Sequence, residues 1–252
     1  MKLSGQKILI TGGGSGIGLE LARRLASDNQ VVIGGRDQQR LARAQAGIPG
    51  LLVHRLDVTS EDEASKAIVW LENELGGLDV LVNNAGLLRS FTLDSDDAAT
   101  NSREDVEVNV LGPIRMTRLA LPLLRDSASG AVVYISSAVA LAAVPGFSVY
   151  AATKAAVHSL ARSLRLELGP GGIRVIEVLP PVVDTGPVND LDVPKLSPEE
   201  VAGAIIAGIE SDREEIRIGR VRQLAVIARI RPGLADRLVT SAFTPLQRRE
   251  ES

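Results

Sequence analysis

A glycine-rich turn near the N-terminus limits the fold of this chain more than any other feature. The short apolar segment Lys7–Ile10 runs into Thr11 and then into Gly12-Gly13-Gly14-Ser15-Gly16-Ile17-Gly18, and a helical pattern follows at once. Glycines let a chain turn tightly and approach a pyrophosphate closely, and the N-terminus of the next helix presents free N–H groups to it. The pattern predicts a strand, a phosphate-binding loop and a helix, as in dinucleotide-binding folds.

The spacing of these glycines separates the loop from related motifs. Gly12-x-x-x-Gly16-x-Gly18 has one more residue in the turn than G-x-G-x-x-G, and no basic residue precedes Gly16. A P-loop needs Lys-Ser/Thr after its last glycine, whereas Leu19-Glu20 follows here, and the chain has no Gly-x-Ser-x-Gly elbow. We therefore disfavour an NTPase and an α/β-hydrolase. The remaining alternative is a glycine-rich turn without a ligand.

Short apolar runs alternate with helical stretches along the rest of the chain. Strands buried on both faces and joined by crossovers form a parallel sheet. We therefore predict an α/β fold, a Rossmann-type doubly wound parallel sheet of about seven strands with helices on both faces. The further strands expected are Gln30–Gly34, Leu51–Leu56, Val80–Asn83, Ala131–Ser136 and Arg174–Leu179, and the helices are Gly18–Ser27, Glu61–Glu74, Arg103–Leu124 and Tyr150–Leu168.

The length favours one domain over residues 1–252, with a core at about 4–220 and a basic tail at 221–252. The acid-rich segment Asp94–Glu107 is interpreted as a solvated loop that leads into a helix capped by Ser102. The N-terminus has no signal-peptide pattern, so we predict a cytoplasmic protein.

The composition excludes several other kinds of site. The chain has no cysteine, which excludes disulfides, thiolate metal sites and a cysteine nucleophile. His54 and His158 are too far apart in sequence for a zinc-binding pair, and we predict no metal site. A net charge of −3, with only three Phe, two Tyr and one Trp, argues against a nucleic-acid partner.

The end of the second strand indicates which dinucleotide binds. NAD-binding folds place an acid there to hold the ribose 2′-hydroxyl. Here Gly35 takes that position and Arg36 follows, and a guanidinium suits a 2′-phosphate in shape and charge. We therefore predict NADP(H) as the cofactor. In the alternative, Arg36 is solvated, Asp37 reaches the ribose and NAD(H) binds.

Four polar residues later in the chain form a candidate catalytic set. Tyr150 and Lys154 are four residues apart, so on a helix they share one face. A free phenol titrates near pH 10, and we expect the nearby ammonium to lower the pKa of Tyr150. Ser137 follows a predicted strand, and Asn109 is polar within an apolar helix. Each residue alone has a structural explanation; their coincidence with the glycine loop predicts catalysis.

With these motifs in place, the chain is similar to the short-chain dehydrogenase/reductase family, in its single-domain branch. The resemblance covers roughly residues 4–190 and includes the glycine loop, the catalytic set and the strand-end motif Asn83-Asn84-Ala85-Gly86. The opening Met1-Lys-Leu-Ser-Gly and the stretch Leu179–Thr185 resemble bacterial DltE-like reductases, named after the teichoic-acid D-alanylation operon. The substrate does not follow from that name.

The resemblance implies hydride transfer between a nicotinamide cofactor and a carbonyl or alcohol. By it, Tyr150 is the acid/base, Lys154 binds the nicotinamide ribose, Ser137 positions the carbonyl and Asn109 holds a water of the proton relay. The alternative is a catalytically silent dinucleotide-sensing or scaffold protein on the same fold. Besides Tyr150 and Lys154, the expected cofactor-binding residues are Gly12, Gly14, Ser15, Gly16, Ile17, Gly18, Arg36, Asp57, Val58, Asn84, Ala85, Gly86, Pro180, Val183 and Thr185.

The substrate side is predicted to be mainly apolar. We expect it to be lined by Leu87, Leu88, Arg89 and Phe91, by Ala138–Phe147 and by Val182–Leu196, which favours an apolar ketone or aldehyde. Arg89 is read as a solvated cation at the rim, with an anionic substrate group as the alternative. Pro180-Pro181 departs from the family's usual Pro-Gly and stiffens the backbone. The role of Asp184 is open.

The C-terminal region is rich in arginine. Within it, Val221–Arg231 has Leu224, Ile227 and Ala228 on one side and arginines on the other, as in an amphipathic helix. We interpret it as a surface helix packed on the domain edge or on a neighbouring subunit, with contact to a membrane surface as the alternative. The resemblance implies a homodimer or homotetramer, because the helices with Asn109 and Tyr150 resemble those that pair between subunits.

Overall fold

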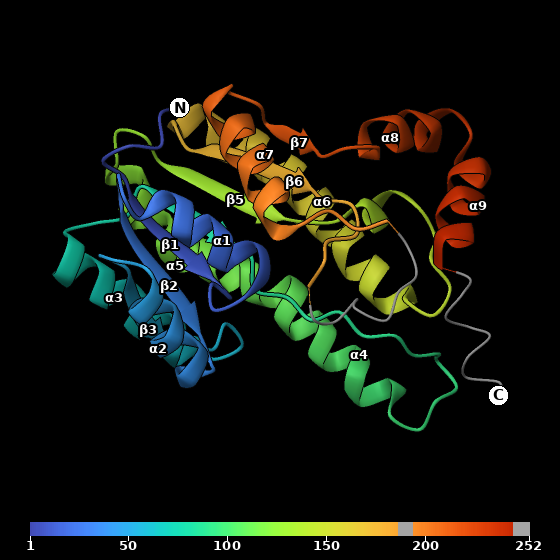
Figure 1. Ribbon diagram of the computed structural model, residues 1–252, viewed down its shortest axis with the longest axis horizontal. Coiled ribbons are helices and arrows are strands. Elements are labelled where there is room, and N and C mark those ends of the chain that lie inside the picture. The colour runs from blue at the N-terminus through green and yellow to red at the C-terminus, as the bar shows by residue number, and fades with distance from the viewer. Residues whose placement is uncertain (186–193, 244–252) are drawn as a thin grey trace.

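One parallel sheet runs through the protein in the computed structural model, which describes residues 1–185 and 194–243 (Figure 1). Within those residues the order of the strands is β3-β2-β1-β4-β5-β6-β7. Their bounds are β1 (Lys7–Thr11), β2 (Gln30–Gly35), β3 (Leu52–Arg55), β4 (Val80–Asn83), β5 (Ala131–Ile135), β6 (Arg174–Leu179) and β7 (Glu215–Arg217). Every neighbouring pair is parallel, so the predicted fold class is confirmed.

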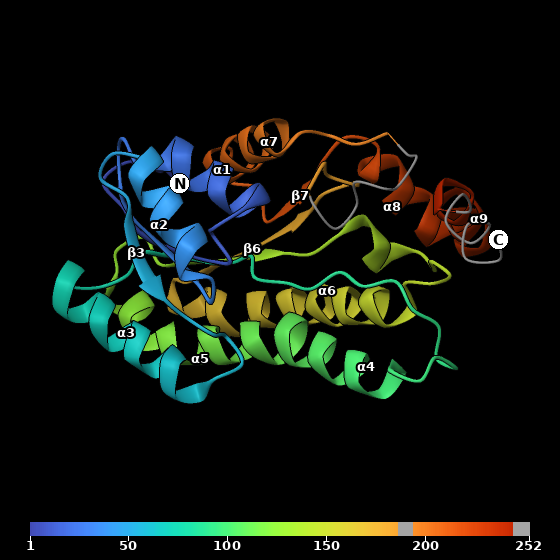
Figure 2. The same ribbon diagram turned by 60° about the horizontal axis from the view of Figure 1, so that its bottom comes forward.

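Helices cover both faces of the sheet, as the two views show (Figures 1 and 2). Successive residues of β1 point to opposite faces: Ile8 and Ile10 belong to one buried apolar cluster, and Leu9 belongs to the other. The first cluster includes buried side chains of α1 (Gly16–Leu25), α2 (Gln38–Gly47) and α7 (Pro198–Glu210). The second includes α3 (Glu61–Leu75), α5 (Gly112–Asp126) and α6 (Ser148–Leu168).

The order of the strands shows where a ligand-binding crevice is expected. It reverses between β1 and β4, because β2 and β3 lie on one side of β1 and β4 to β7 lie on the other. A crevice opens at such a reversal, outside the carboxyl ends of the strands. The glycine loop follows β1, the Asn83-Asn84-Ala85-Gly86 motif begins at the last residue of β4, and Ser137 follows β5. The topology therefore gathers these three segments at one edge of the sheet.

The acid-rich segment differs from its prediction. Helix α4 begins at Ala98, before Ser102, and continues through a π-helical turn at Glu107–Leu111 into α5. Ser102 therefore lies inside a helix, and the helix expected to begin at Arg103 starts one turn earlier. Asp105, expected to be solvated, is fully buried. Tertiary packing of α4 beside α6 explains the difference, which a local charge pattern does not encode (Figure 2).

Several elements had no clear sequence signal. Strand β7 has three residues, of which Ile216 is the buried one, so it lacks the apolar run of the other strands. Helix α9 (Pro232–Phe243) follows α8 (Val221–Ile230) after a single residue. Within the described residues, no helix is both long enough and apolar enough to cross a membrane.

Candidate active site

The glycine loop is held by the motif that follows β4. The Asn84 side-chain amide donates to the carbonyls of Thr11 and Gly12, at 3.0 and 3.1 Å. The Thr11 hydroxyl accepts from the backbone N–H groups of Asn84 and Ala85, both at 3.1 Å. These four bonds join the ends of β1 and β4 and fix the start of the loop against the segment that follows β4.

Two glycines of the loop are required by its conformation. Gly12 has φ +65°, and a Cβ there would come within 2.8 Å of the Ala85 Cα. Gly16 has φ +55°, and a Cβ there would come within 3.0 Å of the Thr185 Cγ2. Both backbone conformations favour glycine. The loop therefore presents bare backbone toward the residues that face it.

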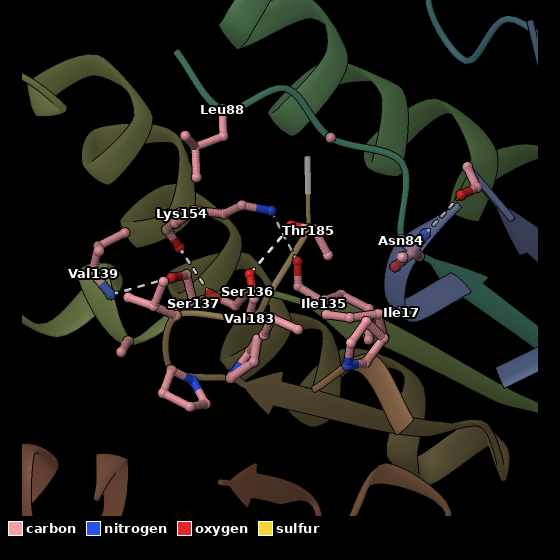
Figure 3. A pocket seen from close by; sticks show the side chains of 18 of the residues that line it. Ile17, Asn84, Leu88, Ile135, Ser136, Ser137, Val139, Lys154, Val183 and Thr185 are labelled. Carbon is pink, nitrogen blue, oxygen red and sulfur yellow. Dashed lines mark hydrogen bonds between the residues drawn. The ribbon is translucent and has the colours of Figure 1, made fainter. Parts of the chain in front are cut away.

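A cavity of about 1510 Å³ runs from the glycine loop to the C-terminal helices. Pockets for drug-sized ligands measure roughly 300–1,000 Å³, so this one has room for a dinucleotide together with a small substrate. Figure 3 shows Ser137, Lys154 and Thr185 around the pocket, with Asn84 and Ile17 also in its wall. The predicted residues that line it are Gly12, Gly14, Ser15, Gly16, Ile17, Arg36, Asp57, Val58, Asn84, Ala85, Gly86, Ser137, Tyr150, Lys154, Pro180, Val183 and Thr185.

Two predicted residues do not line this cavity. A Cβ on Gly18 would come within 2.5 Å of the Asn84 Nδ2, so this glycine allows close packing behind the loop. The Asn109 side chain is 1 % exposed; it accepts from the Leu87 N–H at 2.7 Å and donates to the Leu87 carbonyl at 2.9 Å and the Thr153 hydroxyl at 3.1 Å. Its amide is thus committed to holding the segment after β4 against α6.

Cations gather where β2 ends. Arg36 and Arg40 both line the cavity, and the Arg36 guanidinium lies 4.0 Å from the Asp57 carboxylate. Asp37 caps α2 by accepting the Arg40 N–H at 3.0 Å, and it forms an ion pair with the Arg40 side chain. That backbone hydrogen bond, with the nearby arginines, lowers the pKa of Asp37. Arg40 was missed by the sequence reasoning, which located no helix at α2.

Tyr150 and Lys154 lie on α6 and line the cavity together. The Lys154 Nζ lies 5.7 Å from the centre of the Tyr150 ring. It donates to the Ile135 carbonyl at 2.9 Å (Figure 3). Lys154 is 6 % exposed, and burial lowers its pKa to about 8. A group with that pKa is mostly protonated at neutral pH, so the cavity holds a buried cation beside the phenol.

The pKa of Tyr150 differs from the expectation. Burial raises it to about 12, the Ser137 side chain opposes this shift, and the negative charge of Asp105 adds to it. The expected lowering of the Tyr150 pKa by Lys154 is therefore wrong, because burial dominates the shift. The phenol therefore carries its proton at neutral pH, as a proton donor must.

Ser137 follows β5 and caps the short helix Ala138–Leu141, where its hydroxyl accepts from the Val139 N–H at 3.4 Å. The Ala138 N–H donates to the Pro180 carbonyl at 2.9 Å, which ties this turn to the end of β6. Ser137 therefore has a supported position in the cavity wall beside Tyr150. Pro181 also lines the cavity, where its ring offers no N–H.

Arg89 does not face the cavity. Its guanidinium bonds the Glu104 carboxylate at 2.5 Å and the Asn101 side chain at 3.3 Å, and it lies 3.7 Å from the Asp105 carboxylate. We expected Arg89 to be either solvated or in contact with the substrate. Instead, it joins the segment after β4 to α4. Phe91 also lies outside the lining, whereas Leu87 and Leu88 belong to it.

Asp105 is a buried carboxylate whose two oxygens have no hydrogen-bond partner among the described residues. Burial raises its pKa, and the Arg89 charge opposes the shift. The folded state therefore holds the Asp105 proton to higher pH than the unfolded state, so the stability that this proton supports is lost as pH rises through the folded pKa.

We expect Asp105→Asn to gain stability relative to the native protein as pH rises from about 4 to 7, because the amide has no charge to bury. Thermal unfolding across that range measures this, with exposed Asp126→Asn on α5 as the matched control. A difference in melting temperature that stays constant with pH would contradict the idea.

The far end of the cavity is built by the C-terminal helices. Leu224 and Ile227 of α8 and Leu238 and Val239 of α9 line it, opposite Val139 and Phe147. Asp236 accepts the Ala143 N–H at 2.8 Å and so anchors α9 to the segment before α6. The expected core, up to about residue 220, and the expected tail, 221–252, therefore both contribute residues to one pocket. Part of the expected substrate segment, 186–193, lies outside the described residues.

Comparison with known proteins assigns the family. The family model for short chain dehydrogenases matches residues 6–194. The chain belongs to the short-chain dehydrogenase family. It is 35% identical over 234 residues to the uncharacterized oxidoreductase DltE of Bacillus subtilis, covering 89% of this chain and 92% of that protein. It is 32% identical to an uncharacterized oxidoreductase of Staphylococcus saprophyticus, covering 83% and 93%.

Solved short-chain dehydrogenase structures share the fold. A short chain dehydrogenase from Burkholderia cenocepacia in complex with NADP has TM-score 0.85 and 28% identity, covering 95% of this chain and 100% of that one. The 3-ketoacyl-(acyl-carrier-protein) reductase from Brucella melitensis complexed with NADH has TM-score 0.79 and 26% identity, covering 86% and 98%. This short-chain dehydrogenase is thus an oxidoreductase by family, and its bacterial relatives include the predicted DltE-like group.

Proposed function

We propose that this protein transfers hydride between NADP(H) and the carbonyl or alcohol of a mainly apolar small molecule. The observation that carries the proposal is that Tyr150, Lys154 and Ser137 line the same cavity as the glycine loop. A dinucleotide bound along that loop would supply the hydride from its nicotinamide ring. A panel of ketones, aldehydes and alcohols, followed by reduced-nicotinamide absorbance with NADPH and NADH separately, tests it.

The proposed roles follow from the protonation states of the side chains. In reduction, the carbonyl carbon accepts the hydride and the carbonyl oxygen takes the Tyr150 proton, which the raised pKa keeps on the phenol until then. Lys154 is positively charged at neutral pH and would stabilise the phenolate that Tyr150 becomes. The Ser137 hydroxyl would hold the same carbonyl oxygen. Asn109 would act by fixing the segment after β4 to α6.

The cofactor preference is proposed from the cations at the end of β2. Arg36 and Arg40 would hold a 2′-phosphate, and Asp37, which an NAD enzyme would use for the ribose, is engaged in capping α2. The observed complexes of related structures include both NADP and NADH, so the family alone leaves this choice open.

Arg36→Ala with Arg40→Ala is expected to raise KM for NADPH about 10- to 100-fold, since hydrogen bonds between charged groups contribute about 1.5–3 kcal/mol. KM for NADH should stay unchanged, because NADH has no 2′-phosphate. Arg43→Ala, an exposed position on the same helix that does not line the cavity, is the matched control. Equal effects on the two cofactors would point to a general loss of binding and contradict the assignment.

We further propose a homodimer or homotetramer. Support comes from apolar side chains exposed along one helical stretch, Val106, Leu111 and Ile114, and from Leu166 on α6, which is 80 % exposed. Exposed apolar side chains that gather on neighbouring helices favour association.

A further inference from the structure

Helices α8 and α9 expose apolar side chains to solvent, although both also help to close the pocket. Val226 is 54 % exposed, Ile230 71 %, Leu234 41 % and Leu238 48 %. Val226 and Ile230 are four residues apart on α8, and Leu234 and Leu238 are four apart on α9, so each pair forms a stripe along its helix. Exposed apolar side chains gathered in this way mark a contact surface.

Arginines surround these apolar residues. Residues 220–243 contain five arginines and one acid, whereas the whole chain carries a net charge of −3. The acid, Asp236, is used in anchoring α9 to Ala143. The arginines are exposed, and none forms an ion pair with another described residue: Arg220, Arg222, Arg229, Arg231 and Arg237. Helices α8 and α9 thus form a basic, apolar surface on an otherwise acidic protein.

We propose that this exposed face of α8–α9 docks on an anionic membrane surface. Amphipathic helices with arginines beside apolar side chains lie in the headgroup region, and each basic residue near an anionic bilayer contributes about 1 kcal/mol. A second copy of this chain fits the face poorly, because a two-fold contact would bring the arginines of both copies together. An acidic protein would match the charge of the arginines, but its acidic groups would not account for the two exposed apolar stripes.

Because α8 and α9 also line the pocket, docking on a membrane would affect where the pocket lies. Leu238 belongs to the exposed face and also lines the cavity, and Leu224 and Ile227 line the cavity from α8. Docking would therefore place the apolar end of the pocket next to the bilayer, where an apolar carbonyl compound is concentrated. This consequence rests on the proposed function; the docking itself does not.

Sedimentation of the full chain with vesicles tests the docking. We expect it to sediment with phosphatidylcholine vesicles that contain phosphatidylglycerol, much less with phosphatidylcholine alone, and less as salt is added. Arg222→Gln with Arg229→Gln should weaken binding about 30-fold, the loss of two such arginines. Ile230→Glu should abolish sedimentation by placing a carboxylate in the contact.

Matched changes elsewhere provide the controls. Helix α3 lies at the opposite end of the molecule from α9 (Figure 2). Val69 on α3 is 52 % exposed, so Val69→Glu should sediment like the native protein. Arg43→Gln with Arg125→Gln removes two exposed arginines from other helices and should also leave binding unchanged. Thermal unfolding confirms that each variant is folded.

Two results would overturn the proposal. One is equal sedimentation of the native chain with both kinds of vesicle, or of Ile230→Glu and the native chain. The other is binding to polyglutamate that the arginine changes remove, without sedimentation on vesicles, which would assign the face to an acidic protein. Neither readout uses catalysis, so a failure of docking is distinguishable from a failure of the proposed reaction.

Discussion

Tyr150→Phe is expected to lower carbonyl reduction by about 100- to 10,000-fold, the usual contribution of a positioned general acid. The change removes the hydroxyl and keeps the ring, so the shape of the cavity wall is retained. Binding of NADPH, measured by fluorescence titration, should stay nearly as in the native protein. Loss of turnover without loss of cofactor binding separates a proton donor from a residue that only shapes the pocket.

The chain offers a matched control in its second tyrosine. Tyr134 is fully buried in β5, shares a 2.7 Å hydrogen bond with the Thr117 hydroxyl and, like Tyr150, has a pKa raised by burial to about 12. Tyr134 does not line the cavity. Tyr134→Phe should therefore keep turnover and cost about 1 kcal/mol of stability, one hydrogen bond.

Two outcomes would contradict the assignment of Tyr150. Turnover by Tyr150→Phe within a few-fold of the native rate would remove it from the proton transfer. Tight NADPH binding by the native chain, with no turnover of any carbonyl or alcohol, would instead favour the silent dinucleotide-binding protein.

Lys154→Met is expected to abolish most turnover and, at neutral pH, to stabilise the fold. Burial lowers the pKa of Lys154 to about 8 from its ordinary 10.5, which corresponds to about 3 kcal/mol against the charged form. Methionine has a similar length and carries no charge. A cavity-lining lysine whose charge costs stability fits the role proposed for Lys154 in the reaction.

The stability effect has a definite sign with pH. Between about pH 8 and 10.5 the unfolded chain binds the Lys154 proton and the folded chain does not, so native stability rises with pH there. The advantage of Lys154→Met should thus be largest near pH 7 and shrink toward pH 10. The lost bond to the Ile135 carbonyl is present at both pH values, so it does not alter this trend.

Thermal unfolding of both proteins at neutral and alkaline pH measures the effect. Lys66→Met, at an exposed lysine of α3 paired with Asp62, is the control and should show no such trend. A Lys154→Met advantage that is absent, or equal at both pH values, would mean that Lys154 is not held in a costly environment.

The features of this fold that depend on neighbouring residues could be predicted from the sequence. The six longer strands, the glycine loop and the face shared by Tyr150 and Lys154 depend on residues close together in sequence, and each was located within a residue or two. The π-helical turn at Asn109 and the short strand β7 were not, because neither differs from its surroundings in hydrophobic pattern.

Electrostatics showed the limit of local reasoning most clearly. Spacing alone suggested that Lys154 lowers the pKa of Tyr150, yet burial raises that pKa, with a further contribution from Asp105. Asp105 was read as solvated from its acidic neighbours. Its burial comes from the packing of α4, and desolvation depends on everything that surrounds a group.

The sequence by itself determined the fold class, the family and the identity of the residues that gather at the carboxyl edge of the sheet. Glycine spacing and strand ends are local properties that constrain the backbone directly. Only the tertiary structure decided that Arg40 joins Arg36 and that Arg89 holds α4. It also decided that α8 and α9 close the pocket while they expose arginines and apolar side chains. These relations join residues distant in the chain, and their free energies exist only once the sheet and its helices have brought them into contact.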